Sequence, residues 1–366
     1  MKTNRSLSVF LALAIVMLLA LTTFAGCVAP SQSAPEATKP AQAAAPEKKI
    51  VVGRIMFDLS HPYQQADAKN FETYLQSQGV ETVIIDGKSA PDVMANAMQD
   101  LVAKKVSGIV VQPADGAAIT PAVKEAQKAG IPVSTFFVRT SDGKAPHVNI
   151  NEKRTAYDMG VYVAQKAKEF FPGKDLKLGV INQPGVQYVQ ENRVTPFVEG
   201  VKSVDPKVEV FDVDGGGVRE KALAAGEDLL QAHKDVNIVY GINADSALGA
   251  LAAFEAAGRG KAVDGKPVSE IFVSIDGSEQ EAVRILNPNS ALKVAMALSP
   301  LTNARVNADT IMKAIKGEYG MEQDVAVDTF DTVIDYWRMD LPKVQDFLTT
   351  EYLSKIDLKA ELTKTK

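Results

Sequence analysis

Residues 92–138 read DVMANAMQDLVAKKVSGIVVQPADGAAITPAVKEAQKAGIPVSTFFV, and they contain two successive transitions from helix to strand. Met94 begins a series of apolar residues three or four positions apart, which predicts an amphipathic helix. Short apolar runs follow at 107–113 and 131–138, and Gly130 marks the end of the helix between them. Continuous apolar strands that alternate with helices indicate a parallel sheet that is covered on both faces.

The same alternation extends over the chain on both sides of this stretch. A chain of 366 residues, 46% of them hydrophobic, is long enough for about two domains. The strands form two series separated near residue 150, so the sequence predicts an α/β protein with two doubly wound parallel-sheet domains in tandem. The further runs predicted as strands are 50–56, 80–86, 177–182, 208–213, 237–243, 270–276 and 291–298.

Composition and charge exclude several classes of function. The formal net charge of −5 at pH 7 counts against a nucleic-acid partner. One cysteine and three scattered histidines provide no spacing typical of metal ligands, so no metal site is expected. The glycines at 215–217 do not form a nucleotide-binding fingerprint after the first strand, and no GxxxxGK[ST] motif is present. We therefore expect no cofactor.

The first 27 residues read MKTNRSLSVFLALAIVMLLALTTFAGC and have the organisation of an export signal. Two basic residues precede an apolar run that is too short for a permanent membrane span. The ending FAGC (24–27) resembles the bacterial lipobox, in which the cysteine becomes the new N-terminus and carries diacylglycerol on its sulfur. The alternative is an ordinary secreted protein with Cys27 there by chance. Residues 28–48 are rich in Pro, Ala and Ser, which predicts a flexible tether.

Polar and aromatic residues follow the predicted strands, at the edge where open parallel sheets bind their ligands. Carboxylates and amides pair with neighbouring hydroxyl groups, and aromatic faces cover the C–H side of a sugar ring. This combination indicates a small polyhydroxylated ligand. The residues at these strand ends are Phe57, Asp58, His61, Tyr63, Gln112, Phe137, Arg139, Gln183, Asn243, Asp245 and Asp276.

Structural alternatives stay open for several of these positions. Phe57, Tyr63 and Phe137 are also typical of core aromatics, and His61 is typical of a helix cap or of the surface. Asn243 and Asp276 are the strongest predictions, because a buried polar side chain directly after an apolar strand needs a partner.

Four segments together resemble one family of proteins. The chain is similar to the type I periplasmic substrate-binding proteins of sugar ABC importers, the ribose- and galactose-binding group, over about residues 49–334. The segments that carry the resemblance are DLSHPYQQ (58–65), the stretch 92–133, YGINADSALGALAAFEAAGR (240–259) and VSIDGSEQEA (273–282).

The resemblance implies two α/β domains joined by a three-strand hinge, with crossovers near 149–151, 298–300 and 329–331. The ligand is expected between domains that close by hinge motion. The implied boundaries are 49–149 plus 299–329 for the first domain, 150–298 plus 330–350 for the second, and 351–366 for a C-terminal tail.

The resemblance also assigns roles to particular positions. It places a ring-stacking and hydrogen-bonding turn at His61 and Tyr63, an amide at Gln112, an arginine segment at Glu191 to Arg193, an amide at Asn243 and a carboxylate at Asp276. For Arg193, a surface ion pair is the structural alternative.

Three departures from the family pattern count against a pentose bound in the ribose manner. The chain has Phe137-Val138-Arg139 where ribose binders have Asp-Arg, so only Arg139 is left to substitute. Leu298 replaces a glutamine, and Gln64 replaces the second aromatic residue of the turn.

The sequence thus predicts a monomeric, lipid-anchored extracytoplasmic protein that captures a sugar or sugar-like ligand and delivers it to an ABC permease. One alternative is a receptor of the same fold that serves a membrane kinase or chemoreceptor, or that binds a furanosyl signal molecule. Another is an extracytoplasmic α/β enzyme with Asp245 or Asp276 as general base, although no catalytic motif such as GxSxG supports it.

Overall fold

The computed structural model describes residues 49–327 and 333–364, which belong to one compact unit from Lys48 to Lys366. The predicted export signal, Cys27, the tether at 28–48 and the third crossover at 329–331 lie outside the described residues. Within the described ranges, no helix has both the length and the apolar character needed to cross a membrane.

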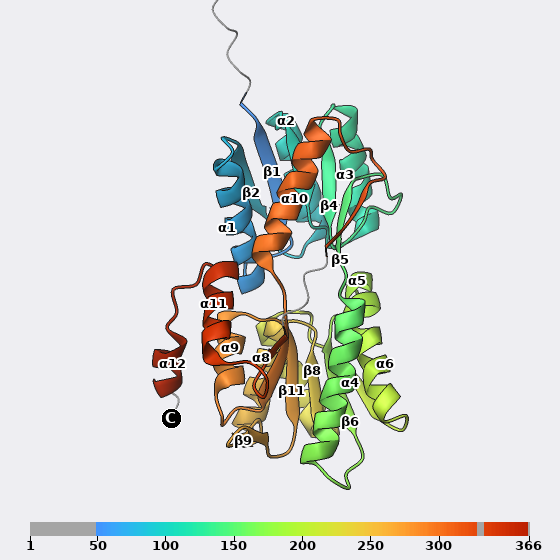
Figure 1. The fold of residues 1–366 in the computed structure, drawn as a ribbon. Coiled ribbons are helices and arrows are strands. Elements are labelled where there is room, and N and C mark those ends of the chain that lie inside the picture. The colour runs from blue at the N-terminus through green and yellow to red at the C-terminus, as the bar shows by residue number, and fades with distance from the viewer. Residues whose placement is uncertain (1–48, 328–332, 365–366) are drawn as a thin grey trace, which may run out of the picture. The chain divides into compact units, whose positions relative to one another are not determined.

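The first lobe is built on a sheet with the order β13-β5-β4-β3-β1-β2, in which all neighbouring strands are parallel. Helices cover both of its faces: α1 (Pro62–Gln76) packs beside α10 (Pro300–Ile315), and α2 (Pro91–Ala103) packs beside α3 (Gly116–Lys128). Figure 1 shows this arrangement. The strands are β1 (Val51–Met56), β2 (Glu81–Asp86), β3 (Gly108–Val111), β4 (Val133–Phe136), β5 (His147–Ile150) and β13 (Asp324–Val327).

The second lobe is built on a sheet with the order β14-β12-β11-β8-β6-β7, in which only β14 is antiparallel to its neighbour. Its strands are β6 (Lys177–Asn182), β7 (Glu209–Asp214), β8 (Ile238–Gly241), β11 (Ile271–Asp276), β12 (Leu292–Ala297) and β14 (Val333–Asp335). A small hairpin pairs β9 (Ala262–Val263) with β10 (Lys266–Pro267). The helices of this lobe are α4 (Lys153–Phe170), α5 (Gln187–Val189), the π-helix η1 (Gln190–Val194), α6 (Thr195–Val204), α7 (Arg219–Ala232), α8 (Ala244–Ala256), α9 (Glu279–Leu286), α11 (Leu341–Glu351) and α12 (Leu358–Lys364).

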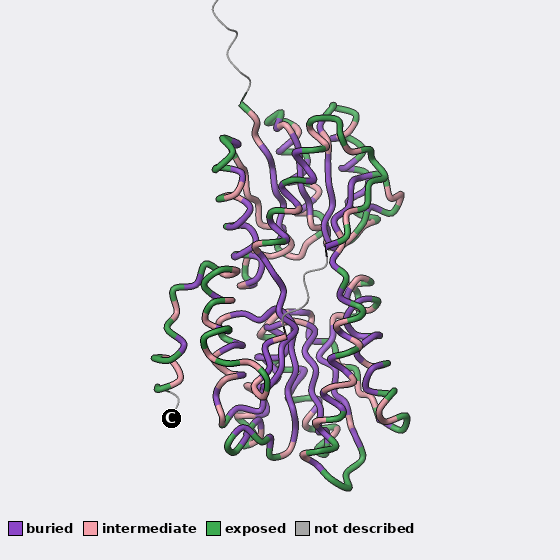
Figure 2. The backbone as a smooth tube through the Cα atoms, in the orientation of Figure 1, coloured by how far each residue is buried: buried purple, intermediate pink, exposed green. Residues whose placement is uncertain are grey.

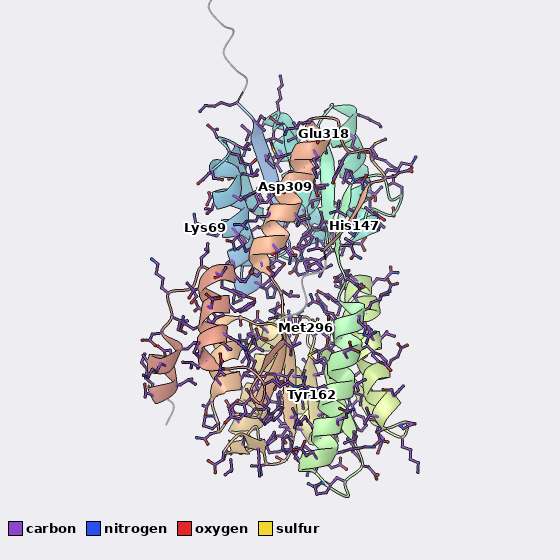
Figure 3. The ribbon with its side chains drawn as sticks, in the orientation of Figure 1. Lys69, His147, Tyr162, Met296, Asp309 and Glu318 are labelled. Atoms are coloured by element: carbon purple, nitrogen blue, oxygen red, sulfur yellow. The ribbon has the colours of Figure 1, made fainter. Side chains whose placement is uncertain are left out.

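The predicted fold class of two doubly wound parallel sheets is confirmed. The central strands are buried, as their purple colour in Figure 2 shows, because helices cover both faces of each sheet. The chain passes between the lobes from β5 to α4, from β12 to α10 and from β13 to β14. Figure 3 shows Met296 on β12 at the end of the second sheet that is nearest the first lobe.

Two glycines allow α4 and α6 to approach closely in the second lobe. A Cβ atom on Gly160 would lie 2.2 Å from the carbonyl oxygen of Phe197, and one on Gly200 would lie 2.1 Å from that of Tyr157. Only glycine permits backbones to pass at this distance. The close approach holds η1, which directly precedes α6, against the beginning of α4.

The sequence predicts a tail at 351–366, and the described part of this segment, 351–364, is packed against the second lobe. It contains α12, and Leu358 on this helix is fully buried beside α9 and α11. The carboxylate of Glu351 accepts hydrogen bonds from the Ser299 hydroxyl at 2.5 Å and the Leu301 amide at 3.1 Å, where the chain enters α10. Apolar burial therefore holds α12 on the second lobe, and the hydrogen bonds of Glu351 connect the beginning of this segment to the junction of the lobes.

Candidate functional site

A pocket lies where strands of both sheets end, and side chains from both lobes line it. Of the eleven residues predicted to bind the ligand, all but Asp58, Arg139 and Glu191 are among these side chains, and the role of these eight in binding stays a prediction. They are Phe57, His61, Tyr63, Gln112, Phe137, Arg193, Asn243 and Asp276.

Asp276 ends β11 and is only 7% exposed. One of its carboxylate oxygens accepts a hydrogen bond from the Ala244 amide at 3.1 Å, and its carbonyl oxygen accepts one from the Tyr352 hydroxyl at 2.6 Å. Burial raises the pKa of Asp276 to about 6, although the nearby Arg193 opposes this rise. Its backbone φ of 115° is one that residues other than glycine rarely adopt, and such strain is concentrated at functional sites.

Arg193 lies in η1 and forms a two-pronged ion pair with Glu152, the N-cap residue of α4. Its Nε is 2.6 Å from Oε2 of Glu152, its Nη2 is 2.8 Å from Oε1, and its Nη1 donates to the Ile242 carbonyl oxygen at 2.8 Å. Burial alone lowers the pKa of Arg193, but Glu152 outweighs it and the net pKa is raised. Three of the five guanidinium N–H groups are thus occupied by the protein, and the positive charge is balanced.

Asn243 is the N-cap residue of α8 as well as part of the pocket lining. Its Oδ1 accepts a hydrogen bond from the Ser246 amide at 2.8 Å, and its Nδ2 donates to the Gly217 carbonyl oxygen at 2.9 Å. One amide hydrogen and one lone pair remain for a ligand. The side chain therefore has a structural role in addition to the predicted ligand contact.

Aromatic rings from both lobes meet at the pocket. The ring of Phe137, which follows β4, is 6.4 Å from that of Tyr63 on α1 and 5.0 Å from that of Tyr188 on α5, in edge-on geometry. The Arg193 guanidinium carbon lies 5.8 Å from the centre of the Phe137 ring. Tyr63 is buried and accepts a hydrogen bond from Asn303 at 2.7 Å, so it belongs to the core and to the pocket at once.

His61 is buried at the beginning of α1, next to Phe57, whose ring centre lies 6.4 Å away. Its Nδ1 is 2.8 Å from Oδ2 of Asp245 in the other lobe. Both pocket cations, Arg193 and a protonated His61, therefore have a carboxylate partner within the protein.

Three predicted residues are not brought to the pocket, because each has a partner elsewhere. Asp58 accepts hydrogen bonds from Ser60 and Ser89 within the loops of the first lobe. Arg139 is 44% exposed and forms an ion pair of 2.6 Å with Asp324 on β13. Glu191 accepts a hydrogen bond from Gln187 one turn earlier. The geometry gives none of the three a place in the lining.

The lining also contains residues that were not predicted as ligand-binding. Gln183 directly follows β6 and is one of the strand-end residues, but it was given no ligand-binding role. Gln64 lies next to Tyr63 in α1, and Tyr188 lies in α5, three residues before Glu191. The side-chain oxygens of Gln64 and Gln112 are buried without a hydrogen-bond partner among the described residues. Buried amides of this kind are acceptors suited to hydroxyl donors.

The comparisons with known proteins agree with this geometry. Residues 36–319 match the family model described as a periplasmic binding protein domain. The ribose import binding protein of Bacillus subtilis is 26% identical over 252 residues, 68% of this chain and 78% of the relative. That of Escherichia coli is 28% identical over 278 residues, 74% of this chain and 86% of the relative.

Solved structures share the fold. A galactofuranose-binding protein has a TM-score of 0.70 at 19% identity and covers 82% of this chain and 98% of its own. The Caulobacter myo-inositol binding protein in complex with myo-inositol has a TM-score of 0.67 at 19% identity and covers 83% of this chain and 97% of its own.

Proposed function

Because this chain belongs to the periplasmic binding protein family, we propose that it is an extracytoplasmic solute-binding protein that captures a neutral sugar or sugar-like polyol. The observation that carries the proposal is the composition of the pocket. Asp276 and Arg193 of the second lobe face the buried amides of Gln64 and Gln112 of the first, and aromatic rings border the space between them. We further propose that the protein acts as a monomer and delivers its ligand to an ABC permease; relatives named ribose import binding proteins support a role in import.

The charges around the pocket support a neutral ligand. Glu152 balances Arg193, and Asp245 balances His61, so neither cation is left over for an anionic ligand. Asp276 adds a buried carboxylate that would repel an acid. A neutral polyol instead donates its hydroxyl hydrogens to Asp276 and accepts from the remaining N–H groups of Arg193.

A thermal-shift screen with matched neutral and acidic sugars tests this proposal. D-galactose, D-glucose, D-ribose and myo-inositol are compared with D-galacturonate and D-gluconate at equal concentration. At least one neutral compound should raise the melting midpoint, since a ligand that binds only the folded state stabilises it by RT ln(1 + [L]/Kd). We expect the acids to give no shift.

The ligand recovered from the protein should be chemically unchanged in a mass spectrum, because the family members matched by this chain are binding proteins. Stronger binding of the acidic sugars, or turnover of the ligand, would contradict the proposal.

We also propose that Cys27, outside the described residues, carries the lipid that anchors the protein to a membrane. Cys27→Ser removes the only cysteine sulfur of the chain, so the protein should move from the membrane fraction to the soluble fraction. Metabolic labelling with a fatty acid should mark the wild type and not the variant. If the variant remains with membranes to the wild-type extent and neither form is labelled, the protein is not a lipoprotein.

A further inference from the structure

A hydrogen-bonded series of three side chains, His61, Asp245 and Arg219, connects the two lobes. His61 lies at the N-cap position of α1 in the first lobe, and Asp245 lies in the first turn of α8 in the second. His61 Nδ1 is 2.8 Å from Oδ2 of Asp245, and the two side chains are only 9% and 12% exposed. The remaining carboxylate oxygen of Asp245 lies 2.9 Å from Nε and 2.8 Å from Nη2 of Arg219, at the beginning of α7.

One end of this series of side chains lies at the pocket and the other end lies away from it. His61 lines the pocket, whereas Asp245 and Arg219 do not. Arg219 also donates to Oε1 of Gln280 on α9 at 3.0 Å, so Asp245 is held in place by groups of its own lobe. The bond between His61 and Asp245 exists only while the lobes are together.

Resting on the proposed function, we propose that Asp245 is a positioning residue for ligand binding: through His61 it holds the two lobes closed over the pocket and raises affinity without touching the ligand. A charge-assisted hydrogen bond between nearly buried groups is stronger than an exposed ion pair, because water competes less for it. The bond adds the same free energy to closure for every ligand that the closed pocket accepts.

The charged groups around His61 make its hydrogen bond with Asp245, called the interlobe bridge below, dependent on pH. Asp245 on α8, Asp276 at the end of β11 and Asp58 in the loop after β1 all act on the imidazole, and Arg219 acts on Asp245. Burial lowers the pKa of His61, but the hydrogen bond and charge of Asp245, with the two other carboxylates, raise it above its usual value of 6.5.

The sign of the pH effect follows from these shifts. When the lobes separate, His61 returns toward its ordinary pKa. The bridge therefore contributes fully below about pH 6.5 and is lost as the pH rises through the raised pKa of the closed state. At acidic pH the hydrogen bond is lost only when Asp245 is protonated. Burial raises the pKa of Asp245, but His61 and Arg219 outweigh burial and the net pKa is lowered.

The distance between the lobes of the unliganded protein tests the proposal without any sugar. Spin labels are placed at Lys69→Cys on α1 and Glu227→Cys on α7, both exposed, in the full chain with Cys27→Ser. We expect a predominantly short distance at pH 6 that shifts toward longer distances at pH 8.5. Asp245→Asn should show the long distance at both pH values, and His61→Gln in the same background should add nothing further.

Asp142→Asn is the matched control, since Asp142 forms an ion pair of 3.0 Å with Lys124 inside the first lobe. It should reproduce the wild-type distances, and melting curves should show all variants folded. Equal distance distributions for wild type and Asp245→Asn at both pH values would overturn the proposal.

Calorimetry with D-ribose, D-galactose and myo-inositol separates this inference from the proposed function. For each of these that the wild type binds, Asp245→Asn should raise Kd at pH 6 by the same factor, on the order of tenfold. A loss that differs from sugar to sugar would mean direct contact and would overturn the proposal. If the wild type binds none of the three, that result counts against the proposed function, and the distances alone decide the bridge.

Discussion

Asp276→Ala is expected to weaken sugar binding by on the order of 10²-fold or more, the largest effect on affinity of any single substitution in the pocket. The carboxylate is buried at the end of β11 and accepts charge-assisted hydrogen bonds, each worth about 1.5–3 kcal/mol. Its removal also leaves ligand hydroxyls without a partner. Titration calorimetry with the sugar found in the screen measures the change.

Asp276→Asn is the control for shape, because it keeps one oxygen acceptor but removes the charge. Its affinity should fall between those of the wild type and Asp276→Ala. Neither variant should lose much stability without ligand, since a buried carboxylate with a raised pKa stabilises the fold little. Wild-type affinity in Asp276→Ala would show that the carboxylate serves only to accept the Ala244 amide.

The acidic side of the wild-type pH profile follows from the same group. Burial raises the pKa of Asp276 to about 6 in the unliganded protein, and hydroxyl donors of a ligand favour the ionised carboxylate. Affinity should therefore fall as the pH decreases through about 6. Asp276→Asn should lack this acidic decline, and its retention in that variant would assign the titration to another group.

Glu152→Gln is expected to lower the free energy of unfolding by about 3–5 kcal/mol, because it removes the carboxylate that is paired with the buried charge of Arg193. Glu152 is fully buried and contacts Arg193 through both carboxylate oxygens. Glutamine has nearly the same shape but is neutral and keeps only one oxygen. Denaturation in urea, with the unliganded protein, measures the difference.

Glu169→Gln provides the matched control on the same helix. Glu169 is 58% exposed and pairs with Lys166 at 2.8 Å, so its loss should change stability by less than about 0.5 kcal/mol. Adding Arg193→Met to Glu152→Gln should restore part of the loss, since both charges are then absent. A change no larger than that of the control would show that the Arg193 charge is solvated in solution.

The sequence by itself was sufficient to predict the fold and the location of the pocket. Apolar strands and amphipathic helices are local patterns, and alternation of the two leads to parallel sheets whose carboxyl ends meet at one edge. For this reason Gln112, Asn243 and Asp276, which end or follow strands, were predicted at the edge where the pocket lies. The strands β5 (HVNI) and β13 (DVAV) were not predicted, because polar residues interrupt their sequences and neither is a continuous apolar run.

Only the tertiary structure decided which polar side chains are available to a ligand. Arg139 and Glu191 lie within two residues of pocket residues in the sequence, yet Asp324 and Gln187 bind their charged groups elsewhere. The pairing of Glu152 with Arg193 and of His61 with Asp245 joins residues 41 and 184 positions apart. Periodicity constrains which face of an element is buried, whereas the partner of each charged group depends on what the folded chain brings within hydrogen-bonding distance.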